Sequence, residues 1–150
     1  MVLEGEMMSV FSPQLIDLHL AHSDKHGAIS KLAAMVVASG RGDNADLITR
    51  DVLARDAMGT PQIDGIAIPH ARTDGVQTSC VVVARSKGVQ FGEGEDSAKI
   101  IIMILVPIQA RDEHIKILSH LARKLIEPKV KEVLHNAEDP LEIIKVLNSD

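Results

Sequence analysis

Two short apolar runs constrain the fold of this chain more than any other feature. They are SCVVVARS at 79–86 and KIIIMILVP at 99–107, and both are rich in valine and isoleucine without regular polar alternation. A strand with one wet face alternates between apolar and polar residues, whereas a strand covered on both faces does not. The sequence therefore predicts two buried strands in a central sheet with helices on both faces, an α/β architecture in a single domain.

The segment between the two runs indicates how they pair. Residues 87–98, KGVQFGEGEDSA, are polar and glycine-rich, with a short additional strand expected around Val89 to Phe91. Two parallel strands need a long crossover, usually a helix, and this segment contains no helical period. We therefore expect a mixed sheet, while the order of its strands stays open.

Strand and helix patterns precede these runs. The alternation in LIDLHLA predicts a first strand, and KHGAISKLAAMVVASG carries an apolar stripe at helical spacing that ends at Gly40, a typical C-terminal cap. The stripe consists of Ile29, Leu32, Ala33, Val36 and Val37. A second helix is expected from an N-cap at Asp43 or Asn44 to Gly59.

The last third of the chain returns to helical spacing. An apolar line predicts a helix that begins near Asp112 and ends before Pro128, followed by a short helix over 129–134. The line comprises Ile115, Leu118, Ala122 and Leu125. The final helix has a clear start, with Asp139 as N-cap and Pro140 in the first turn.

Composition excludes several classes of function. The 150 residues include 16 basic and 21 acidic side chains, for a formal charge of −5, and no Trp or Tyr, which argues against a nucleic-acid partner. The apolar run at 100–107 is far shorter than the ~20 residues that cross a bilayer, and no signal peptide is recognisable, so we expect a cytoplasmic protein. We expect one domain over 11–150 after a flexible segment at 1–10, with Cys80 as a buried, inert thiol.

His70 is the first candidate for chemistry. It follows Pro69 in GIAIPHAR, residues 65–72. Proline fixes its own backbone angle and biases the residue before it to an extended conformation, so the strand is expected to end here and to project His70 outward. On this stretch alone, a histidine that merely closes a strand is an equally good interpretation.

Two further residues suit the same chemistry. His114 stands in the first turn of the helix predicted from Asp112, where unpaired amides and the helix dipole favour a phosphate. Arg55 lies near the end of the helix before the motif, and its guanidinium can grip phosphoryl oxygens bidentately. Each also has a plain interpretation, namely a passive first-turn histidine and a surface arginine paired with Asp51 or Asp56.

The remaining histidines are expected to take no part in chemistry. His19, His22 and His26 lack a carboxylate at metal-ligand spacing and are expected to form a solvated cluster. His120 and His135 fall on polar helix faces and are expected to be exposed.

The motifs that are missing narrow the choice further. The chain has no Walker-type glycine loop, no GxSxG, no HExxH and no cysteine pair, so no cofactor or metal is expected. A neutral imidazole as nucleophile, a second imidazole and an arginine suit phosphoryl transfer to histidine. A metal-assisted hydrolase that uses His70 and His114 is a much weaker interpretation, since no carboxylate stands in motif spacing.

In this order, the motifs resemble the type-2 enzyme IIA domain of the bacterial phosphoenolpyruvate-dependent sugar phosphotransferase system. This is the fructose and mannitol class, to which nitrogen-regulatory IIA proteins also belong. The resemblance extends from about Phe11 to Leu147 and implies a central mixed sheet flanked by helices. It rests on FSPQLIDLHL, LARD, GIAIPHAR, GVQFGEGEDSAKIIIMILVP and DEHIKILSHLARKL.

The resemblance implies a role for each candidate residue. His70 corresponds to the histidine that accepts a phosphoryl group from the histidine phosphocarrier protein and passes it to a cysteine or histidine of a IIB component of a sugar permease. His114 corresponds to the second active-site histidine, which stabilises the phosphohistidine. Arg55 corresponds to the arginine that binds the phosphoryl group, with Asp56 in place of the usual glutamate.

Two features of the resemblance leave alternatives open. The stretch between Arg55 and His70 looks one residue shorter than is usual, with Pro61 and Gln62 where small residues are common, so the loop beside the site is expected to have its own shape. The implied function is a phosphocarrier for uptake of a sugar of the fructose class. The alternative is a nitrogen-type regulator whose phosphorylation state controls its binding to other proteins.

Overall fold

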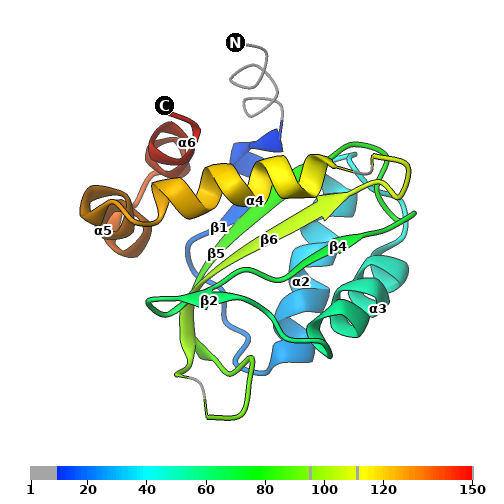
Figure 1. The fold of residues 1–150 in the computed structure, drawn as a ribbon, viewed down its shortest axis with the longest axis horizontal. Coiled ribbons are helices and arrows are strands. Elements are labelled where there is room, and N and C mark those ends of the chain that lie inside the picture. Colours follow the sequence, from blue (N-terminus) through cyan, green and yellow to red (C-terminus); the bar gives the residue numbers. More distant parts are fainter. Residues whose placement is uncertain (1–9, 95, 111, 150) are drawn as a thin grey trace.

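The two apolar runs form the long central strands of a six-stranded mixed sheet in a computed structural model that describes residues 10–94, 96–110 and 112–149 (Figure 1). Strand β5 (Cys80–Val89) pairs antiparallel with β6 (Ala98–Val106), which confirms the predicted mixed pairing. The register shifts between Arg85 and Val89, so Val89 continues β5 beyond an irregularity. The prediction of a separate strand around Val89 to Phe91 is therefore wrong.

Short strands complete the sheet on both sides. Strand β1 (Ile16–Asp17) runs parallel to β5 and is shorter than the alternation predicted, although the Leu20 amide also donates to the Arg85 carbonyl. On the other side, β3 (Ile66–Ala67) and β4 (His70–Arg72) both lie parallel to β6. Strand β2 (Gln62–Ile63) forms the outer edge, antiparallel to β3.

Strands β3 and β4 lie against β6 in one register on either side of Pro69. Ile66 pairs with Ile100 and His70 pairs with Ile104, the same offset along β6. Pro69 has no N–H to give to the ladder, but its carbonyl accepts from the Ile104 amide at 3.0 Å. Strand β3 thus ends before Pro69, but the prediction that His70 projects outward is wrong: a second strand begins at His70 in the same register, and His70 is only 8 % exposed.

Helices cover both faces of the sheet, which confirms the α/β architecture (Figure 1). Helices α2 (Lys25–Ala38) and α3 (Ala45–Asp56) share one core with Val82 and Ala84 of β5. Helices α4 (Glu113–Lys124), α5 (Pro128–Asn136) and α6 (Pro140–Asn148) share the other with Val81 and Val83. Because successive strand residues point to opposite faces, the unalternating run supplies both cores.

Side-chain caps fix the starts of three of these helices. Asp24 caps α2, Asn44 caps α3 and Asp139 caps α6, each by accepting a backbone amide of the first turn. A 3-10 turn (Pro13–Leu15) precedes β1. Residues 1–9 of the expected flexible segment lie outside the described residues, and Val10 is buried in the core beneath α4, α5 and α6.

The buried face of α4 differs from the predicted one. Ile115 is 54 % exposed, while Ile117 and Leu121 face the core together with His120 and Lys124. The prediction that His120 is exposed is therefore wrong. The helix is rotated toward α6, where a ring nitrogen of His120 lies 2.6 Å from the Leu147 carbonyl oxygen and the Lys124 ammonium donates to Ser149. Polar partners therefore make burial of both side chains possible, and an apolar pattern does not register them.

Other expectations about single residues are met. Cys80 is buried, and burial raises the pKa of its thiol to about 12, as expected of an inert cysteine. His19, His22, His26 and His135 are exposed. No helix in the described ranges is both long and apolar enough to cross a bilayer.

Candidate active site

His70 stands at the start of β4 with one ring nitrogen fixed by the backbone. Its Nδ1 lies 3.1 Å from the carbonyl oxygen of Ile68. A carbonyl can only accept, so this contact assigns the proton to Nδ1 and leaves the lone pair on Nε2. Burial is the main cause that lowers the pKa of His70, and the nearby charges of Arg55 and His114 lower it further against the opposing effect of the Ile68 bond. The ring is therefore a neutral imidazole with a nucleophilic Nε2 at neutral pH.

His114 faces this ring from the start of α4. The two ring centroids are 6.4 Å apart and the ring planes differ by 15°. The buried Nδ1 of His114 has no hydrogen-bond partner within the described ranges, and Asp112 at the N-cap makes no side-chain cap. An uncapped first turn and an imidazole that still has an unpaired nitrogen suit a negatively charged group beside His70.

Arg55 reaches the same place from the last turn of α3. Its Nη1 donates to the Gly59 carbonyl at 2.8 Å. Neither ion pair that the sequence allowed is formed, since Asp51 contacts Arg50 at 3.4 Å and Asp56 binds Lys25 at 2.5 Å. The remaining guanidinium donors of Arg55 are therefore not held by those two carboxylates.

The three predicted residues line one pocket of about 450 Å³ together with Ala71 and Arg72 of β4. Sequence reasoning missed the other lining residues. The pocket is lined by Asp51, Arg55, His70, Ala71, Arg72, Ile108 and His114. Alternation along a strand could have signalled Arg72, which stands two residues after His70 and so shares its face. No group of three or more potential metal ligands occurs in the part of the chain that the structure describes.

Comparison with known proteins gives this arrangement its context. The family described as "Phosphoenolpyruvate-dependent sugar phosphotransferase system, EIIA 2" matches residues 9–150. The chain belongs to this family. It is thus an EIIA component, a phosphoryl-transfer protein of the phosphotransferase system.

Similarity to individual proteins agrees with this assignment. The chain is 38 % identical over 144 residues to a "PTS system fructose-specific EIIA component" of Haloferax volcanii, covering 93 % of this chain and 94 % of that protein. It is 27 % identical over 130 residues to "Multiphosphoryl transfer protein 1" of Escherichia coli, covering 85 % of this chain but only 16 % of that much longer protein.

Solved structures of EIIA proteins share the fold. The nitrogen regulatory protein IIA-Ntr of Neisseria meningitidis superposes with a TM-score of 0.84 at 23 % identity, covering 94 % of this chain and 98 % of the other. IIA mannitol of Escherichia coli superposes with a TM-score of 0.76 at 25 % identity, covering 91 % and 98 %. A complex of the same mannitol protein with phosphorylated IIB is also similar, with a TM-score of 0.76 at 26 % identity, covering 91 % and 96 %.

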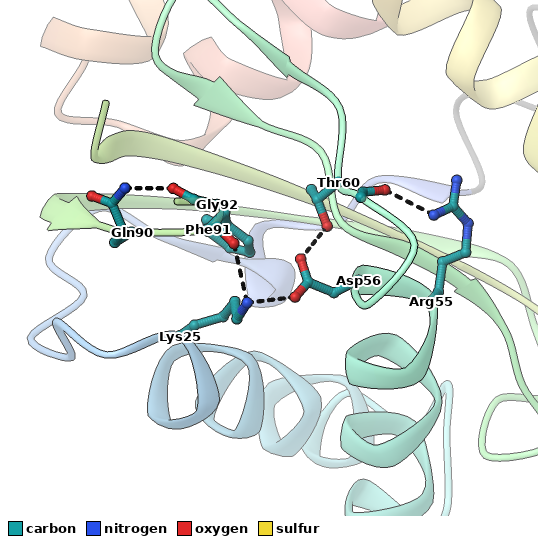
Figure 2. A network of polar contacts seen from close by, with 8 residues as sticks. Lys25, Arg55, Asp56, Thr60, Gln90, Phe91 and Gly92 are labelled. Atoms are coloured by element: carbon teal, nitrogen blue, oxygen red, sulfur yellow. Dashed lines mark hydrogen bonds and ion pairs between the residues drawn. The ribbon is translucent and has the colours of Figure 1, made fainter. Parts of the chain in front are cut away.

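A polar network fixes the end of α3 in this EIIA protein. Asp56, whose side chain is 7 % exposed, accepts from the Lys25 ammonium and from the Thr60 hydroxyl, each at 2.5 Å. The same ammonium donates to the Phe91 carbonyl at 3.1 Å. Figure 2 shows Asp56 turned toward Lys25 and Arg55 turned away from it, toward the loop after α3. Asp56 thus holds that loop, and the loop offers Arg55 its carbonyl at Gly59.

A separate contact fixes the start of α4. The hydroxyl of Ser79, the residue just before β5, donates to a carboxylate oxygen of Glu113. Glu113 is the first residue of α4 and precedes His114, so this bond ties the helix terminus to the sheet. The site is therefore assembled by two independent tethers, one for each helix end.

Proposed function

We propose that this protein is a phosphocarrier that is transiently phosphorylated on Nε2 of His70. The single observation that carries the proposal is that a neutral His70, with Nδ1 committed to a carbonyl, shares one pocket with His114 and Arg55. Nε2 attacks the phosphorus of a phosphohistidine on the donor protein. One N–P bond forms, the N–P bond of the donor breaks, and its electron pair returns to the donor ring.

The surrounding groups stabilise the charge that arrives. A phosphoryl group brings about −1.5 to −2 charges, by analogy with other phosphorylated side chains. Arg55 donates from its free guanidinium nitrogens, and His114 with the amides of the uncapped first turn of α4 provides further donors. The bond from Nδ1 to the Ile68 carbonyl keeps the ring oriented in both directions of transfer.

Family membership supports the identities of the partners. The donor is the histidine phosphocarrier protein, and the acceptor is a cysteine or histidine of a IIB component of a sugar permease. A similar EIIA protein has been solved in complex with phosphorylated IIB. These exchanges take place in the cytoplasm, where the protein approaches the membrane only through the permease.

The sugar class we propose is that of fructose. The 38 % identity to a fructose-specific EIIA component extends over nearly the full length of both chains. The similarity to the nitrogen regulatory protein, at 23 % identity, is a similarity of fold and does not favour the regulatory alternative.

Transfer of radioactive phosphate tests the proposal. The protein is incubated with labelled phosphoenolpyruvate and the two general phosphotransferase proteins, and then with a fructose-class IIB domain. We expect acid-labile label on the wild type, drained by IIB, and none on His70→Ala, while the exposed His135→Ala control is labelled normally. Undiminished label on His70→Ala would overturn the site, and label that no IIB removes would favour the regulatory role.

A further inference from the structure

Arg72 has a side chain in the pocket that neither the fold nor the proposed roles account for. Its backbone is fixed, because Arg72 pairs with Val106 of β6 and the next amide, of Thr73, donates to the Val106 carbonyl at 2.9 Å. Its guanidinium makes no ion pair or hydrogen bond with any residue in the described ranges, and the residue is exposed. A rigid strand therefore presents a long cation that no carboxylate neutralises.

The strand directs this cation toward His70. Ala71 packs in the core on the side of α2 and α3, so the alternation of β4 turns His70 and Arg72 to the opposite face, where α4 and His114 lie. Arg72 lines the same pocket as His70 and His114. Among pocket residues it is the one that shares a strand face with the nucleophile.

Arg72 can offset part of the negative charge that a phosphoryl group on His70 would bring into the pocket. Apart from the two histidines, the ionisable side chains lining the pocket before phosphorylation are two cations, Arg55 and Arg72, and one anion, Asp51, which contacts Arg50 outside the lining. A phosphoryl group of about −2 charges makes the sum about −1 with Arg72 present and about −2 without it. Nη1 of Arg55 also donates to the Gly59 carbonyl, so not all N–H groups of this guanidinium are available to the phosphoryl oxygens.

We propose that Arg72 is a second phosphoryl-binding arginine, which contacts the oxygens on His70 in the transfer transition state and in the phosphorylated protein. This inference rests on the proposed phosphorylation of His70. The guanidinium fork suits two phosphoryl oxygens at once, so Arg72→Lys keeps the charge but loses the bidentate contact.

Two measurements on Arg72→Gln and Arg72→Lys test the inference, with Arg123→Gln as the matched control on the exposed side of α4. The first is the rate of phosphorylation as a function of the concentration of phosphorylated donor protein. We expect kcat to fall roughly tenfold in Arg72→Gln, less than the about 100- to 1,000-fold typical of a lost buried donor because this group is exposed, with KM within twofold of wild type. Arg72→Lys should recover part of kcat, and Arg123→Gln should match wild type.

The second measurement is the hydrolysis rate of isolated, phosphorylated protein, which involves no partner. We expect the hydrolysis rate of the phosphohistidine to change several-fold in Arg72→Gln and to stay the same in Arg123→Gln. A rise in KM alone, with unchanged kcat and hydrolysis, would assign Arg72 to protein docking and overturn the inference. If His70→Ala loses its label while Arg72→Gln behaves as wild type, only the role of Arg72 fails; if His70→Ala keeps its label, the proposed function itself fails.

Discussion

The two helix ends that meet at His70 are built in opposite ways. Helix α3 ends there with a cationic side chain, Arg55, and a loop held by the Lys25, Asp56 and Thr60 network. Helix α4 begins there with an N-cap residue, Asp112, that makes no side-chain cap, an imidazole with a buried nitrogen that has no partner among the described residues, and one hydrogen bond from Ser79. The negative end of one helix dipole and the positive end of the other therefore face the same pocket.

Under the proposed function, this difference accounts for the arginine at the end of α3 and the imidazole at the start of α4. An anion near the C-terminus of α3 meets the carbonyls of the last turn, so a guanidinium must project past them and be anchored there. An anion near the N-terminus of α4 meets the positive end of the helix dipole and the amides of the first turn, so no side chain has to project past carbonyls there. We expect loss of the His114 side chain at the α4 end to affect mainly catalysis, and substitutions in the α3 network to affect mainly stability.

The largest effect is expected for His114→Ala. The substitution removes a donor from the phosphoryl site but no contact that holds α4 in place, so the rate of phosphorylation should fall about 100-fold while the melting temperature stays within about 2 °C of wild type. Rapid-quench phosphorylation and thermal unfolding measure the two quantities, with His135→Ala as control. A wild-type rate would remove the α4 side chain from the chemistry and contradict the comparison.

The next effect is expected for Asp56→Ala, at the α3 end. It leaves the Lys25 ammonium, 32 % exposed, without its carboxylate and frees the loop at Thr60, so unfolding should become easier by about 2 kcal/mol, or about 4–8 °C in melting temperature. Asp56→Glu, which keeps a carboxylate at this position, should restore most of this stability. Equal stability of Asp56→Ala and wild type in thermal and urea unfolding would mean that the network in Figure 2 contributes little.

Residue types and spacing were enough to select three residues that the structure brings together in one pocket, but not the hydrogen bonds that fix the two helix ends. Arg55, His70 and His114 were predictable because each has a local signal, and the unalternating runs gave the covered sheet. The bonds from Lys25 to Asp56 and from Ser79 to Glu113 join residues 31 and 34 positions apart, and the contact between His120 and Leu147 joins residues 27 positions apart. Such pairings depend on how elements pack, which spacing does not encode.

The extended chain around Pro69, between β3 and β4, is a second case in which packing decides what spacing alone cannot predict. A proline predicts an interruption from its missing N–H alone. What keeps the chain extended is the parallel neighbour β6, whose Ile104 amide still bonds the Pro69 carbonyl. The reason for which the sequence singles out His70 is therefore partly wrong, since this candidate lies inside a pocket on a strand and not at a projecting strand end.

A smaller effect is expected for Ser79→Ala at the α4 end. The lost bond to Glu113 involves a carboxylate that is exposed to solvent, so the cost in unfolding free energy should be about 1 kcal/mol, roughly half that of Asp56→Ala. The start of α4 should loosen, which hydrogen exchange of its first amides would report. If Ser79→Ala destabilises the protein more than Asp56→Ala does, the expectation that the α3 network contributes more stability than the bond from Ser79 to Glu113 is wrong.

The smallest effect is a difference in the titration of His70 between variants at the two ends. Burial is the main cause of its lowered pKa, and Arg55 contributes more than His114. Arg55→Gln should therefore raise the pKa of His70 more than His114→Gln does, as followed by the NMR shifts of its ring, while the titration of the exposed His135 stays where it is. Below pH 6.5 the unfolded chain binds the His70 proton more readily than the folded protein, so stability is lost as the pH falls from about 6.5 through the lowered pKa. His70→Gln should lack this part of the acid destabilisation. The opposite order of the two variants would mean that the uncapped helix end, and not the anchored arginine, sets the electrostatic environment of the nucleophile.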